Sequence, residues 1–175
     1  MTDPHILHRF VLIAAFAAAL AAANASAADP HRHNAEMPPA PTSPTGPIEV
    51  ALDEAMIARL PQIVAAGEAH GRKLSCEGVA LHELLRASGA MPSAPLRGAD
   101  LARVVVVRAR DGYRAAFSLA ELDPSLGNRQ VVLSRRCDGA ALAADDGPWR
   151  LIAPGESRPA RWVRQVESIR VVDAP

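Results

Sequence analysis

The chain predicts an α+β fold with a mixed, mainly antiparallel sheet and short helices. A run of four β-branched residues, Val104–Val107, is typical of a strand. The pairs Asp111-Gly112 and Asp138-Gly139 favour hairpin turns, because glycine readily takes a positive φ. Short helical patterns stand among the strands without regular βαβ alternation, which indicates α+β rather than a parallel α/β class.

Residues 1–28 are typical of a secretory signal peptide. His5, His8 and Arg9 precede an apolar run, Phe10–Ala23, and the small residues Ala25-Ser26-Ala27 follow it. The alternative is a membrane span, but the run is mostly alanine and falls short of the roughly 20 residues that cross a bilayer. We therefore expect export, a periplasmic or secreted location and no membrane span after cleavage.

Residues 29–47 are rich in proline and polar residues, which predicts a flexible leader. His31 and His33 lie in this leader, where nothing fixes a metal-binding geometry, so a solvated tail is the better interpretation. Residues 48–175 then form one domain, because the remaining length suits a single hydrophobic core.

The first part of this domain predicts two strands and two helices. Alternation over Ile48–Leu52 indicates a half-buried strand, and Asp53 can cap a short helix that ends before Pro61. A second short strand is expected at Leu74–Cys76. Apolar residues from Val79 onward recur at near-helical spacing until Gly89, where a left-handed residue can end the helix.

The central part predicts a hairpin and a brief helix. The continuous valine run suggests a strand buried on both faces, and Tyr113–Phe117 returns beside it after the turn. Ser118 can then cap a helix over Leu119–Leu122, with Glu121 in its favourable first turn.

The last part predicts three more strands. Val131–Cys137 leads into the second Asp-Gly turn, and Asp146-Gly147-Pro148 marks another turn before Arg150–Ala153. Val166–Val172 alternates imperfectly and is expected at the edge of a sheet.

The chain has two cysteines, Cys76 and Cys137, and each is expected at the end of a strand. An oxidising compartment favours a disulfide between them if the strand ends are neighbours. The alternative is a pair of buried free thiols, and the sequence leaves both open.

In the final third of the chain, the stretch Asp145–Pro154 is followed by Arg158, Arg161 and Trp162. This segment resembles the closing segment of the molybdopterin-binding oxidoreductase domain of sulfite oxidases. The same family opens a helix with a pattern that Gly78–Leu85 and Gly89 match. The resemblance extends to both Asp-Gly turns, the second together with Leu142, and covers about Ile48 to Val172.

The resemblance implies a site for an anionic cofactor, molybdopterin. Arg158 and Arg161 stand at the family's basic positions, and Arg150 and Tyr113 are further candidates for binding the pterin. A guanidinium fork suits phosphate or other oxyanions. The alternative is a solvated loop in which these arginines pair with Glu156 or Glu167.

The family's metal-binding cysteine lies in a Cys-x-Gly-Asn type motif, and this chain contains no such motif. Two functions follow: a small molybdopterin-oxidoreductase-like protein that binds an anionic ligand such as a pterin, or a cofactor-free periplasmic binding or accessory module. Enzymatic activity stays open. The net charge of zero argues against nucleic acid as a partner, whereas a periplasmic protein partner is compatible with either function. No hydrolase motif occurs.

Overall fold

The computed structural model describes residues 46–174, so the predicted signal peptide and nearly all of the leader lie outside the described residues. The described part is an α+β domain, as predicted, but its strands form two antiparallel sheets instead of one mixed sheet. The strands are β1 (Ile48–Val50), β2 (Gln62–Ala69), β3 (Arg72–Ala80), β4 (Arg103–Ala109), β5 (Arg114–Ser118), β6 (Val132–Cys137), β7 (Ala140–Ala141), β8 (Arg150–Ile152) and β9 (Val166–Asp173). One sheet has the order β1-β9-β4-β5, and the other has β2-β3-β6-β7 with β8 also paired to β6.

Short helices connect the strands, and their caps follow the sequence closely. The Asp53 carboxylate accepts a hydrogen bond from the Met56 N–H at 2.7 Å, and the Ser118 hydroxyl accepts one from the Glu121 N–H at 3.0 Å. Gly89 has a φ of +69° just beyond the second helix, as the predicted left-handed ending requires. The helices are α1 (Glu54–Ile57), α2 (Leu81–Ala87), α3 (Leu119–Leu122) and the 3₁₀ helices η1 (Gly98–Ala102) and η2 (Pro159–Arg161).

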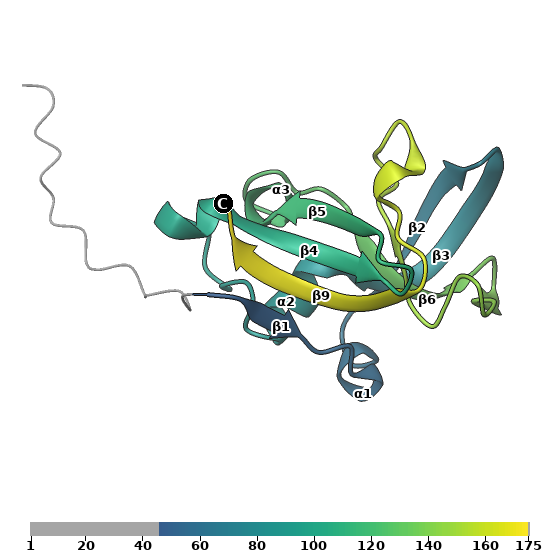
Figure 1. Ribbon diagram of the computed structural model, residues 1–175, viewed down its shortest axis with the longest axis horizontal. Coiled ribbons are helices and arrows are strands. Elements are labelled where there is room, and N and C mark those ends of the chain that lie inside the picture. The colour runs from purple at the N-terminus through teal and green to yellow at the C-terminus, as the bar shows by residue number, and fades with distance from the viewer. Residues whose placement is uncertain (1–45, 175) are drawn as a thin grey trace, which may run out of the picture. The chain divides into compact units, whose positions relative to one another are not determined.

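The strand β9 is not an edge strand, so that prediction is wrong. It pairs with β1 on one side, where Val50 lies opposite Ile169, and with β4 on the other, where Val105 lies opposite Val171. Figure 1 shows β9 between these two neighbours. Alternation along a strand reports which face is buried and carries no information about how many strands pair with it.

The valine run of β4 is also less buried than predicted. Val105 and Val107 are fully buried, whereas Val104 and Val106 are half-buried. Only one face of this sheet packs fully into the core, so the strand belongs to the ordinary antiparallel type with one covered face.

The second sheet contains a strand, β2, that the sequence did not predict. It pairs with β3 along its whole length, from Gln62 opposite Val79 to Ala69 opposite Arg72. The strand β3 is therefore longer than the expected Leu74–Cys76 and includes Val79, which was assigned to the helix.

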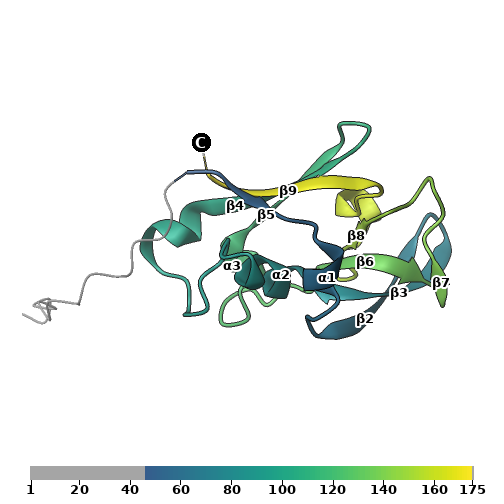
Figure 2. The same ribbon diagram turned by 90° about the horizontal axis from the view of Figure 1, so that it is seen from below.

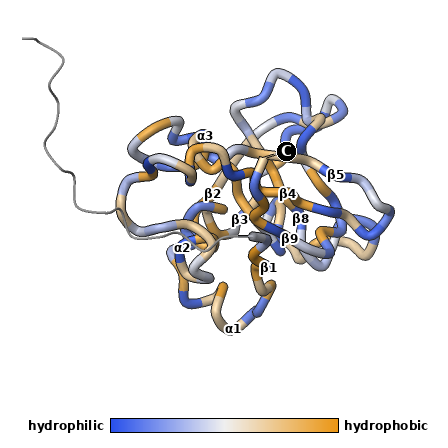
Figure 3. Tube along the Cα trace, turned by 60° about the vertical axis from the view of Figure 1, so that its left-hand side comes forward, coloured by the Kyte–Doolittle hydropathy of each residue, from blue (hydrophilic) through white to orange (hydrophobic). Residues whose placement is uncertain are grey.

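A single hydrophobic core joins both sheets and the helix α2. In Figure 2, β4 and β9 lie on one side of it, with α2, α3 and the second sheet on the other. Figure 3 shows hydrophobic stretches around β3 and β4 and hydrophilic stretches in the outer loops. The largest fully buried side chains include Phe117 from β5, Leu84 and Leu85 from α2, Leu133 from β6 and Leu151 from β8.

Candidate functional site

The helix η2 carries the basic residues that the sequence singles out. Trp162 follows it directly, and its buried indole Nε1 donates a hydrogen bond to the Ala153 carbonyl at 2.9 Å. The indole also lies against β2, because a Cβ added to Gly67 would come within 2.7 Å of Trp162 Cη2. These contacts anchor η2, so the side chains of Arg158 and Arg161 start from a fixed backbone.

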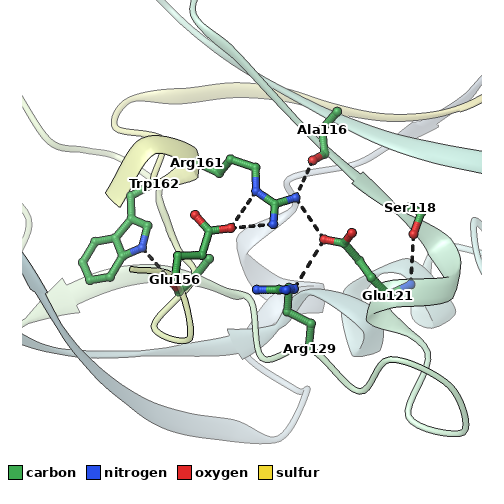
Figure 4. Close-up of polar contacts among 8 residues, drawn as sticks. Ala116, Ser118, Glu121, Arg129, Glu156, Arg161 and Trp162 are labelled. Carbon is green, nitrogen blue, oxygen red and sulfur yellow. Dashed lines mark hydrogen bonds and ion pairs between the residues drawn. The ribbon is translucent and has the colours of Figure 1, made fainter. Parts of the chain in front are cut away.

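Arg161 is held by carboxylates of the same domain. Its Nε donates to Glu156 Oε1 at 2.6 Å, and its Nη1 donates to Glu121 Oε1 at 3.0 Å and to the Ala116 carbonyl at 2.9 Å. The guanidinium also stacks over the Phe117 ring, 4.3 Å from its centroid. Figure 4 shows Arg161 pointing between Glu156 and Glu121, with these contacts drawn as dashed lines.

The charges of this cluster balance internally. Glu121 Oε1 also lies 3.6 Å from Arg129 Nε, so two carboxylates face two guanidinium groups. Glu156 is the more buried carboxylate, with its side chain 12% exposed, and it would be costly to leave unpaired. Of the two expected pairings, the one with Glu156 is present, whereas Glu167 instead lies 3.6 Å from Arg108.

Arg158 and Tyr113, two other predicted site residues, lie near η2 but do not form a shared binding site with Arg161. Arg158 precedes η2, is exposed, and makes no ion pair with any residue between 46 and 174. Tyr113, from the β4–β5 hairpin, donates a hydrogen bond from its hydroxyl to the Ala160 carbonyl, which ties that hairpin to η2. Its phenol is half exposed. Tyr113 therefore lies near η2, where its hydroxyl contributes to the fold through a hydrogen bond to the backbone.

Arg150 lies apart from this cluster, at the start of β8. It is only 7% exposed, and its Nη1 donates to Asp146 Oδ2 at 3.0 Å. Its Nε is buried and has no hydrogen-bond partner within the described part of the chain. Arg150 thus combines a buried positive charge with an unfilled donor.

Arg150 lines a cavity of about 380 Å³, which we call the Arg150 cavity. Hairpin ends of the second sheet, the loop before β8 and the segment around η2 form its walls. The basic residues Arg72 and Arg164 also line it, and neither was predicted as a site residue. Nothing in the sequence marks them, because Arg72 lies far along the chain from Arg150 and Arg164 belongs to none of the motifs. The remaining lining residues are Ala69, His70, Leu74, Cys137, Asp138, Ala141, Leu142, Ala143, Asp145, Asp146, Pro159 and Trp162.

Cys76 and Cys137 face each other across β3 and β6 and form a disulfide. The backbone N–H of Asp138 donates to the Ser75 carbonyl at 2.7 Å, and the Ser75 N–H donates to Asp138 Oδ1 at 2.9 Å. Both strands are therefore joined next to the cavity, which Cys137 lines.

No cluster of three or more histidine, cysteine, aspartate or glutamate side chains among residues 46–174 is arranged to hold a metal ion. Within the same range, no helix has the length and apolar character needed to cross a membrane. The chain matches no known family model, and no curated protein matches it.

Proposed function

We propose that this protein is an exported, cofactor-free binding or accessory module, on a fold that resembles the molybdopterin-binding domain of sulfite oxidases. The observation that carries this proposal is the internal pairing of Arg161. Its guanidinium donates to Glu156, Glu121 and a backbone carbonyl, so a cofactor phosphate would have to displace carboxylates that are already in place.

The surroundings of Arg161 fit a pterin phosphate poorly for a second reason. An anion placed there would approach the carboxylates of Glu156 and Glu121, and like charges in close contact are unfavourable. The disulfide of Cys76 and Cys137 supports the exported location, because disulfides persist in oxidising compartments.

The competing function is a small molybdopterin-oxidoreductase-like protein. One observation favours it: Arg158 is exposed, and no carboxylate of the described residues neutralises it. It could therefore contribute to holding an anionic group at the surface of η2. A single exposed guanidinium provides little affinity for a cofactor, which makes this the weaker of the two proposals.

Elemental analysis of the mature protein distinguishes the two. The protein is purified from the exported compartment of cells that make molybdopterin, and molybdenum and oxidised-pterin fluorescence are measured against protein concentration. We expect neither above background. Stoichiometric molybdenum together with pterin would overturn the proposal and establish the oxidoreductase-like alternative.

A further inference from the structure

We propose that the Arg150 cavity binds a small monocarboxylate with a compact apolar body. The inference rests on the proposed function only in treating the domain as a binding module. It assigns a site and a ligand class that the resemblance to sulfite oxidases does not supply. The cavity, at about 380 Å³, falls within the range of pockets that enclose small organic molecules.

Arg150 is a buried guanidinium with a single anionic partner. Its Nη1 donates to the carboxylate of Asp146, and its Nε is closed off from solvent and has no acceptor among the described residues. A buried charge depends on ion pairs, because burial removes it from water. A carboxylate bound in the cavity would bring a second anionic group near this guanidinium without accepting from Nε.

Asp146 lies near two arginines of the cavity. Its Oδ2 lies 3.0 Å from Arg150 Nη1, and its Oδ1 lies 3.9 Å from Arg164 Nε. Arg72 lines the same cavity and has no ion pair with any described residue. One ligand carboxylate would therefore meet a set of guanidinium groups that Asp146 alone pairs incompletely.

The other acidic residues of the cavity limit the ligand to a single negative charge. Asp138 Oδ1 already accepts the Ser75 N–H, and Asp145 is exposed to solvent. Three arginines and three aspartates line the cavity in all, so its formal charge is balanced. A polyanion would be repelled by the aspartates, whereas one carboxylate beside the arginines would not add a large net charge.

Beside its charged side chains, the cavity has a smaller apolar part. Leu74 and Trp162 are buried and Leu142 is half-buried, and they line the cavity together with Ala69 and Pro159. Sites for small organic ligands combine apolar lining with a few convergent polar groups. A carboxylate attached to a compact apolar body can contact both parts, whereas a small inorganic oxyanion contacts only the charged one.

Calorimetric titration with three probes tests the proposal. Benzoate carries both features, benzamide keeps the apolar ring without the charge, and inorganic phosphate has charge without an apolar body. We expect saturable binding of benzoate. Benzamide should bind about tenfold more weakly because it loses the charged contact, and phosphate about tenfold more weakly because it loses the apolar contact. Binding of benzamide as tight as that of benzoate, or of phosphate tighter than either, would overturn the proposal.

Variants at the rim locate the site without disturbing the core. Arg72→Ala and Arg164→Ala replace exposed side chains, and each should weaken benzoate by about three- to tenfold. The matched control is Arg114→Ala, an exposed arginine of β5 outside the cavity, which should leave affinity unchanged. Equal affinity in all three variants would overturn the assignment. Molybdenum and pterin content is measured separately, so failure of this site and failure of the proposed function remain distinguishable.

Discussion

The sequence predicted Arg161 as a ligand-binding residue, whereas in the fold its side chain connects separate segments of the domain. Its side chain joins η2, β5 and α3 through Glu156, the Ala116 carbonyl and Glu121. The residue type and its place before a tryptophan were predictable. The partner Glu121 was not, since it lies 40 positions away along the chain.

Replacing Arg161 should therefore destabilise the protein in the absence of any ligand. We expect Arg161→Ala to lower the free energy of unfolding by about 1–3 kcal/mol, because it leaves Glu156 partly buried without its charged partner. Urea denaturation measures the change. Arg158→Ala is the control and should stay within about 0.5 kcal/mol, as expected for an exposed surface residue. Unchanged stability in Arg161→Ala would show that the guanidinium is free to bind a ligand.

Asp123, just after α3, gives the stability of the domain a predictable dependence on pH. Burial by itself raises the pKa of this carboxyl, but hydrogen bonds from the Ser125 hydroxyl and N–H, together with the Arg86 charge, lower the pKa below its ordinary value. A folded-state pKa below the unfolded one stabilises the fold above the unfolded pKa of about 3.9. That contribution disappears as the pH falls through the folded pKa.

Asp123→Asn should consequently cost about 1–3 kcal/mol at neutral pH, because it removes a buried charged acceptor. The difference from the parent protein should shrink as the pH drops below about 4. Urea denaturation across pH 7 to pH 3 measures both effects, with Asp145→Asn as an exposed control. A difference that grows toward acid pH would contradict the assignment of a lowered pKa.

Among the elements, β2 shows most clearly why part of the fold escaped prediction. Its sequence Gln62–Ala69 holds three alanines and a glycine, with only Ile63 and Val64 as β-branched residues. Local propensity for a strand is therefore low. Pairing with β3 and the packing of Trp162 against Gly67 fix the strand, and both contacts come from elsewhere in the chain.

The Gly67 contact can be tested by one substitution. Gly67→Ala places a Cβ within 2.7 Å of Trp162 Cη2, so the indole or the strand must shift, at a cost of about 1–3 kcal/mol. Gly155→Ala is the matched control, because a Cβ there meets nothing within 4 Å. Thermal unfolding followed by tryptophan fluorescence compares the two. Equal stability of the two variants would mean that Trp162 does not pack on β2.

The disulfide joins β3 to β6, the central pair of the second sheet. It closes a loop between positions 61 apart, and such a cross-link typically stabilises a fold by about 2–4 kcal/mol. The double variant Cys76→Ala with Cys137→Ala should lose that amount in urea denaturation. Reductant should lower the stability of the parent protein similarly and leave the double variant unaffected. A parent protein insensitive to reductant would contradict this role.

For the domain as a whole, the sequence predicted the features that depend on neighbouring residues. The α+β class, the caps at Asp53 and Ser118 and the hairpin turns at Gly112 and Gly139 are all present. Each depends on a few adjacent positions. The interior place of β9 and the missed strand β2 depend on pairing between distant segments, which local patterns do not encode.

In the candidate site, too, the sequence predicted which residue types matter but not how they are arranged in space. The sequence identified Arg150 and Arg161 as notable residues, but not that one lines a cavity while the other is neutralised. Arg72 and Arg164 join Arg150 only because the hairpin ends of the second sheet and the segment after η2 meet around one cavity. Residue type was thus readable from the sequence, and the role of each residue was not.

Two-dimensional amide NMR of isotope-labelled protein, titrated with benzoate, distinguishes carboxylate binding in the Arg150 cavity from binding at Arg161. We predict saturable shifts confined to the cavity walls, at residues 69–72 and 138–146. Shifts confined instead to Ala116, Glu121 and Glu156 would contradict the proposed site and place the anion at Arg161.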